Sequence, residues 1–142
     1  MTDARLERDF PVTPDRLYAA VTNPAEVSRW WGPEGMTLGD HTLEFTKLGP
    51  WHSVIQGDEG RTMKMSGQIT SLDPPKSVGF TWAWHDENDA RGHESHVTFT
   101  IVETTDGAKL IIDHRDLQDE DQAQGHSRGW TSTLNCLAAL FE

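Results

Sequence analysis

The chain has 142 residues, 35% of them hydrophobic, and a formal net charge of −11 with histidine counted as neutral. We expect one domain spanning residues 1–142, because this length can bury a substantial hydrophobic core. The acidic balance argues against partners rich in phosphate, so we expect neither nucleic-acid binding nor attachment to an anionic membrane. No apolar run is long enough to span a bilayer, and no basic-then-apolar signal segment is visible.

Residues 4–10 alternate between apolar and polar side chains, which predicts a β-strand. Its apolar face carries Ala4, Leu6 and Phe10. Arg8 falls on the same face and breaks the pattern. We expect Arg8 to lie either near the end of the strand or beside a buried acid, for which Glu44 and Asp113 are the candidates.

Two short helices are predicted after this strand, because a capping residue followed by proline occurs twice. Thr13-Pro14 marks the first start and Asn23-Pro24 the second. The Gly32-Pro33 pair ends the second helix. Apolar residues recur at helical spacing, as Leu17, Tyr18 and Val21 and then as Val27, Trp30 and Trp31.

Two tryptophans are adjacent at the end of the second helix. Neighbouring residues on a helix point about 100° apart. We therefore expect Trp30, which extends the stripe of Val27, to be buried, and Trp31 to lie at the rim of a groove between helices and sheet. The other tryptophans, which indicate an aromatic-lined interior, are Trp51, Trp82, Trp84 and Trp130.

From residue 36 to residue 115 the apolar pattern changes to a period of two, which predicts an antiparallel meander. Segments 36–45 and 50–56 are the weaker strand candidates. The clearer strands carry Met63, Met65 and Ile69, then Val78, Phe80, Trp82 and Trp84, then Val97, Phe99 and Ile101, then Leu110 and Ile112. One face of this sheet is strongly apolar and must be covered.

The cover is a predicted helix over residues 122–141, with an apolar stripe formed by Trp130, Leu134, Leu137 and Phe141. Gly125 and Gly129 each cost this helix about 1 kcal/mol relative to alanine, and a glycine there lets it pass close to a strand or a ligand. The predicted fold class is therefore α+β: a curved antiparallel sheet of about six to seven strands wrapped around a long C-terminal helix, with two short helices after strand one.

Four ordered segments resemble the signatures of a known family: NPAEVSRWWGP (Asn23–Pro33), GQITSLDPPKSVGFTW (Gly67–Trp82), HVTFTIVE (His96–Glu103) and GHSRGWTSTLNCLAAL (Gly125–Leu140). The family is the one named after the activator of the heat-shock-protein-90 ATPase. It belongs to the helix-grip superfamily that includes START domains, polyketide cyclases and the birch-pollen allergen. The sequence departs from the family at Gly49-Pro50, where a Gly-Gly pair is often found.

The resemblance implies a helix-grip fold with a hollow between the sheet and the long helix, which in such proteins often holds an apolar or amphipathic small molecule. Methionine and tryptophan side chains give an adaptable lining that suits flat apolar ligands. The candidate ligand-binding residues are Trp31, Met63, Met65, Phe80, Trp82, Trp84, Phe99, His114, Trp130 and Leu134.

No nucleophile elbow, phosphate loop, dinucleotide fingerprint or zinc signature is present, so we expect no cofactor, no metal site and no catalytic residue. Cys136 is the single cysteine, which excludes an internal disulfide and favours a cytoplasmic location. Its position beside the apolar stripe predicts a buried, inert thiol. His85 and His93 flank a hairpin tip, where they either meet with an acid such as Glu87 or Glu94 or remain solvated.

His114 continues the apolar face of its strand and should point inward. A buried imidazole needs a partner, so His114 is either a hydrogen-bonded structural residue or a polar anchor for a ligand or general base. His126, near the start of the last helix, has the same alternatives.

Three functions remain open at this stage. The first is binding of an apolar or aromatic small molecule. The second is a co-chaperone module that binds a chaperone and stimulates its ATPase. The third is a cyclase-like or hydrolase-like enzyme using His114 or Arg8. A monomer and a homodimer are both compatible with the sequence.

Overall fold

The computed structural model describes residues 1–142, apart from the side chain of Glu59. The elements in chain order are β1 (Thr2–Phe10), α1 (Pro14–Thr22), α2 (Pro24–Trp30), β2 (Thr37–Thr42), β3 (Gly49–Gln56), η1 (Asp58–Gly60), β4 (Thr62–Asp73), β5 (Ser77–Trp84), β6 (Ser95–Thr104), β7 (Gly107–Leu117) and α3 (Glu120–Ala139). The predicted α+β fold class is confirmed, including both short helices and the weaker strand candidates.

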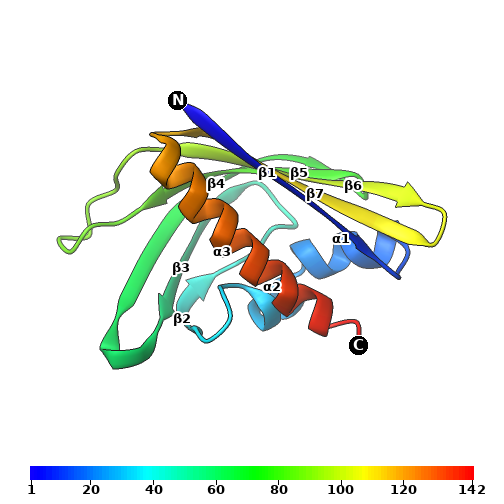
Figure 1. The fold of residues 1–142 in the computed structure, drawn as a ribbon, viewed down its shortest axis with the longest axis horizontal. Helices are drawn as coiled ribbons and strands as arrows, with labels where there is room; N and C mark the ends of the chain where they lie inside the picture. The colour runs from blue at the N-terminus through cyan, green and yellow to red at the C-terminus, as the bar shows by residue number, and fades with distance from the viewer.

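All seven strands form one antiparallel sheet in the order β1-β7-β6-β5-β4-β3-β2. The sheet curves around α3, which crosses its inner face, and α1 and α2 lie near the C-terminal half of α3 (Figure 1). This arrangement places the apolar faces of the strands against the apolar stripe of α3. None of the described helices combines the length and the apolar character needed to cross a membrane.

The α1–α2 corner is fixed by side-chain hydrogen bonds to the backbone. Asn23 Oδ1 accepts from the backbone N–H of Ala25 at 3.0 Å and so caps α2. The carbonyl of buried Ala20 has no helical donor four residues on, because the chain leaves α1 at Asn23 and Pro24 has no N–H. The indole Nε1–H of Trp30 donates to that carbonyl at 2.8 Å. In the first signature, therefore, Pro24 leaves the Ala20 carbonyl without a helical donor, and Trp30 supplies the missing hydrogen bond.

The glycine that opens the second signature is required by the backbone of Thr81 and the indole of Trp51, which lie close to it. Gly67 on β4 faces Trp51 on β3. The Trp51 indole lies over Gly67 and donates its N–H to the backbone carbonyl of Thr81 at 2.9 Å. A Cβ at Gly67 would stand 1.9 Å from that carbonyl oxygen and 2.7 Å from Trp51 Nε1. Any larger residue would therefore displace the backbone or the indole.

Of the two alternatives for Arg8, the carboxylate partner is wrong, and Arg8 lies close to the end of β1 at Phe10. The half-buried Arg8 guanidinium donates to Asn135 Oδ1 on α3 at 2.6 Å. Asp113 instead pairs with Arg5 at 3.1 Å, and the two residues are register partners on β1 and β7. Because side chains alternate along a strand, Asp113 lies on the outer face with Arg5, while Arg8 faces the helix.

Candidate functional site

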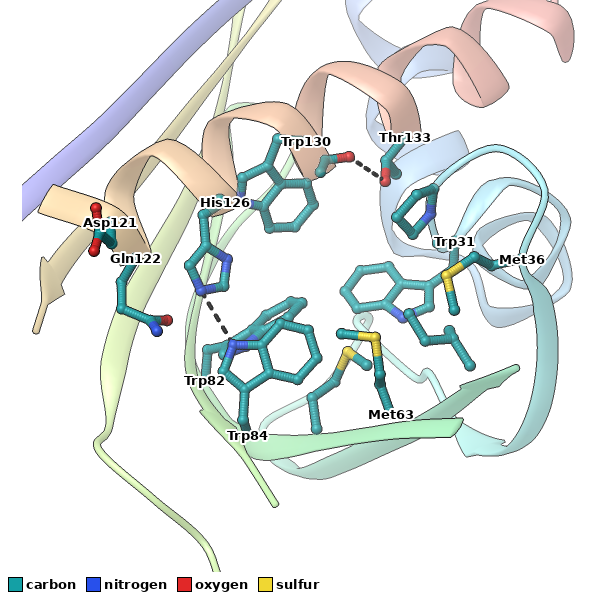
Figure 2. Close-up of a pocket in the computed structure, with 16 residues that line it drawn as sticks. Trp31, Met36, Met63, Trp82, Trp84, Asp121, Gln122, His126, Trp130 and Thr133 are labelled. Carbon is teal, nitrogen blue, oxygen red and sulfur yellow. Dashed lines mark hydrogen bonds between the residues drawn. The ribbon is translucent and has the colours of Figure 1, made fainter. Parts of the chain in front are cut away.

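A pocket of about 550 Å³ opens between the sheet and α3, and we call it the sheet–helix pocket (Figure 2). Its walls come from the segment after α2, the strands β3 to β5, and one face of α3. The strand residues that line it are Ile55, Met63, Met65, Trp82 and Trp84. The helix contributes Gln122, Gly125, His126, Gly129, Trp130 and Thr133, with Asp121 at the helix start.

The pocket includes six of the ten residues expected from the sequence: Trp31, Met63, Met65, Trp82, Trp84 and Trp130. The other four, Phe80, Phe99, His114 and Leu134, are buried but do not line it. Phe80 and Phe99 pack edge to face against each other, 5.2 Å between ring centroids, deeper in the core. Alternation on a strand gives the face of a side chain, but not how far along the sheet it lies.

Trp31 does not lie at an exposed rim as expected, because only 6% of it is accessible. It contacts five aromatic residues: Trp30, Phe45, Trp51, Trp82 and Trp130. Its indole N–H donates to the hydroxyl of fully buried Ser53 at 2.9 Å. The expectation assumed helical geometry at both tryptophans, whereas α2 ends at Trp30 and Trp31 has an extended backbone with ψ 129°. Trp31 therefore forms part of the inner wall of the pocket.

His114 is fully buried, and both of its ring nitrogens are bonded within the protein. Nδ1 accepts from the indole N–H of Trp130 at 3.1 Å, and Nε2 lies 2.7 Å from the Ser95 hydroxyl. Burial, together with the nearby His126, lowers the pKa of His114 to about 2, so the ring is neutral. Of its alternatives, the structural one fits this geometry, because neither nitrogen is left for a ligand or for proton transfer.

His126, for which the sequence leaves open a structural role and a role as ligand anchor or general base, lies on the pocket wall. Its Nε2 accepts from the indole N–H of Trp84 at 3.3 Å, as the dashed line in Figure 2 marks. Burial lowers the pKa of His126 to about 4. The ring centroids of His126 and His114 are 4.2 Å apart. His126 also lines a smaller cavity of about 290 Å³, which shares Trp82, Trp84 and Gln122 with the pocket as well.

Gly125 and Gly129 stand one helical turn apart on the face of α3 that lines the pocket. A Cβ at either position would meet nothing within 4 Å, so both face open space. Neither glycine is needed for close packing against a strand. In the sequence, Gly125 directly precedes His126, and four residues later Gly129 directly precedes Trp130. This repeat is the signal from which the pocket face of α3 could be predicted.

The histidines of the hairpin tip do not meet. His85 bonds to Ser66 at 2.7 Å and to the Asp89 carboxylate at 2.8 Å, whereas His93 donates to the Asp116 carbonyl at 2.6 Å. No group of three or more histidine, cysteine, aspartate or glutamate side chains among the described residues could hold a metal ion. Cys136 is half-buried rather than buried, and burial raises the pKa of its thiol, with Glu34 adding to the effect.

A curved antiparallel sheet around a long C-terminal helix, with a pocket between them, defines a protein of the helix-grip class. The sequence matches the family described as "Activator of Hsp90 ATPase homolog 1-like protein" over residues 11–142, and the chain belongs to this family.

One solved structure supports this family assignment, and two more distant ones show the fold alone. The AHSA1 protein of Silicibacter pomeroyi is 51% identical, with a TM-score of 0.95 over 98% of this chain and 96% of its own. A protein of Chromobacterium violaceum is 24% identical, with a TM-score of 0.87 over 100% and 99%. One of Mycobacterium smegmatis is 19% identical, with a TM-score of 0.82 over 99% and 90%. These last two share the fold. No curated protein matches the chain.

Proposed function

We propose that this protein binds an apolar or aromatic small molecule in the sheet–helix pocket. The observation that carries the proposal is the pocket itself, whose volume of about 550 Å³ lies within the usual range for ligand sites of roughly 300–1,000 Å³. Seven of its sixteen lining residues are tryptophan or methionine, and four have polar side chains. Methionine side chains adapt to irregular shapes, and indole faces stack on flat rings.

The two helix glycines support the same proposal. Glycine inside a helix is less stable than alanine by about 1 kcal/mol, and here the space for a methyl group is empty. Folding alone therefore gives no reason for Gly125 or Gly129. A reason for both glycines is that they keep the pocket open for a ligand.

Gly129→Leu tests the proposal by filling the pocket with a side chain from α3. The probe is aminoanthracene, whose fluorescence rises in an apolar site. We expect the wild-type protein to enhance this fluorescence saturably, and Gly129→Leu to weaken binding at least tenfold because leucine occupies the same space.

Gln124→Leu is the matched control, since it adds the same side chain to an exposed position of α3 outside the pocket. It should bind the probe like the wild type. Absence of saturable binding by the wild type, or equal binding by Gly129→Leu, would count against the proposal. Native mass spectrometry of protein purified from its own host would then identify a carried ligand by its added mass.

Co-chaperone activity is the second candidate, and the family membership favours it. It needs a docking face, but the exposed large hydrophobics of the described residues, Met1, Leu48 and Val102, lie in three separate parts of the chain. Mixing the protein with the heat-shock-protein-90 chaperone of its host measures the ATPase directly. If the rate of ATP hydrolysis by the chaperone did not change, and the two proteins did not co-purify, this candidate function would be excluded. In the enzyme alternative, His114 is not a free base, because both of its ring nitrogens are bonded within the protein.

A further inference from the structure

Resting on the function proposed above, we propose that the Nδ1–H group of His126 selects pocket ligands that are flat, aromatic and carry an uncharged carbonyl oxygen. The pocket then has a defined polar contact point on its helix wall, in addition to its apolar surface.

The tautomer of His126 follows from its neighbour Trp84. An indole nitrogen can only donate a hydrogen bond, so the contact between Trp84 Nε1 and His126 Nε2 requires a bare Nε2. A neutral imidazole with a bare Nε2 carries its proton on Nδ1. The ring is neutral at physiological pH because burial lowers its pKa to about 4.

The Nδ1–H of His126 finds no acceptor among the described residues, since the contact with Trp84 is the one hydrogen bond of this side chain. In Figure 2 the second ring nitrogen of His126 lies on the side of the ring that is turned toward the other pocket residues. His114, the nearest polar ring, has both nitrogens bonded elsewhere. The proton is therefore available to a ligand.

A second donor without a partner lies beside the first. Trp82 Nε1 is buried and has no hydrogen-bond partner among the described residues. The Trp82 and His126 rings are 5.6 Å apart between centroids, and both line the pocket. A buried donor left unpaired, such as Trp82 Nε1, is costly. An acceptor that reaches both this donor and the His126 Nδ1–H would therefore gain more than one placed in water.

Charge decides between a neutral and an anionic acceptor. No lysine or arginine is among the described residues that line the pocket, whereas Asp121 lies at its wall. The chain carries a net charge of −11. A carboxylate or phosphate would therefore enter a site without a cation to pair with, at a high desolvation cost. A carbonyl oxygen accepts the same hydrogen bond without that cost, and the indole walls favour an aromatic body.

Fluorenone and fluorene form a matched pair of probes, because both are flat three-ring molecules and only fluorenone has a carbonyl. Quenching of tryptophan fluorescence gives the dissociation constant of each. One hydrogen bond corresponds to roughly a threefold to tenfold change in affinity. We expect the ratio of the two constants, fluorene over fluorenone, to be larger by that factor in the wild type than in His126→Phe.

His126→Asn is the rescue variant, since its amide keeps a donor near the position of Nδ1. Both variants lose the ring nitrogen that accepts from Trp84, and only His126→Asn keeps a side-chain donor. His126→Asn should keep the wild-type ratio. In the wild type, proton–nitrogen correlation spectra should show a downfield shift of the Trp82 indole proton with fluorenone and not with fluorene, a readout that needs no variant.

The outcomes are distinct. An equal ratio in wild type and His126→Phe, or no selective shift of the Trp82 proton, overturns this inference and leaves the proposed ligand binding intact. Binding of neither probe to the wild type overturns both. Tighter binding of fluorene carboxylate than of fluorenone would also contradict the inference, because it would mean that the site prefers an anion.

Discussion

At the scale of single residues, the adjacent tryptophans have two separate structural roles. Trp30 supplies the donor that the Ala20 carbonyl lacks. Trp31 lies at the centre of an aromatic cluster and bonds to Ser53, whose side chain is fully buried. In each case an indole N–H satisfies an otherwise unpaired oxygen, so the polar atom of the ring matters as much as its area.

A double-mutant cycle at Trp31 and Ser53 tests this interpretation. Trp31→Phe leaves the Ser53 hydroxyl without its partner, and Ser53→Ala leaves the indole N–H unpaired in the core. Each should cost about 1–3 kcal/mol from the unpaired group, in addition to any lost packing. The double variant removes both groups, so it should lose less stability than the sum of the single variants, by about 1 kcal/mol. Urea unfolding measures all four proteins, and additive losses would contradict the interpretation.

At the scale of elements, the strands and helices could be predicted because their signals are local. Alternation located the strand of Val78 to Trp84, and cap-plus-proline pairs located α1 and α2. The pocket could be predicted only in part. Met36 and Ile55 line it from segments with weak periodicity, and their distance from α3 is set by packing between elements far apart in sequence. Likewise, the alternation of side chains along its strand predicts that His114 points inward. It does not tell whether His114 lies in the core or on the wall of the pocket.

The pocket face of α3 gives a prediction of its own. Gly125→Ala and Gly129→Ala should each raise the free energy of unfolding by roughly 0.5–1 kcal/mol, because alanine is the better helix former and its Cβ meets nothing within 4 Å. Chemical unfolding in urea measures the gain. Gly67→Ala is the contrasting control and should be strongly destabilising, since its Cβ would overlap the Thr81 carbonyl. A loss of stability at both helix positions would mean that glycine is needed there for packing.

At the scale of the whole molecule, the sheet and α3 are joined by a buried layer of indole and imidazole rings. His114 comes from β7 and His126 from α3, and their ring centroids are 4.2 Å apart. Trp130 on the helix donates to His114, and Trp84 on the sheet donates to His126. Each hydrogen bond requires a bare ring nitrogen, so the contact between the two layers depends on both imidazoles remaining neutral.

Acid should therefore weaken the folded state through these two histidines. In the folded protein their pKa values lie near 2 for His114 and near 4 for His126, below the ordinary value of 6.5. Above about pH 6.5 neither state takes up these protons, and the full stability is present. As pH falls below that value the unfolded chain binds protons that the folded chain does not. Stability then decreases by up to roughly 1.4 kcal/mol per pH unit for each histidine, with the part due to His126 ending near pH 4.

Urea unfolding between pH 7 and pH 5 measures this slope in a range where most carboxylates remain ionised. With both histidines contributing, we expect the stability to fall by about 2–3 kcal/mol per pH unit once the pH is below about 6. His126→Gln should remove roughly half of the slope, because glutamine does not titrate. If His126→Gln and the wild type kept the same slope, His126 would not be a group that couples folding to pH.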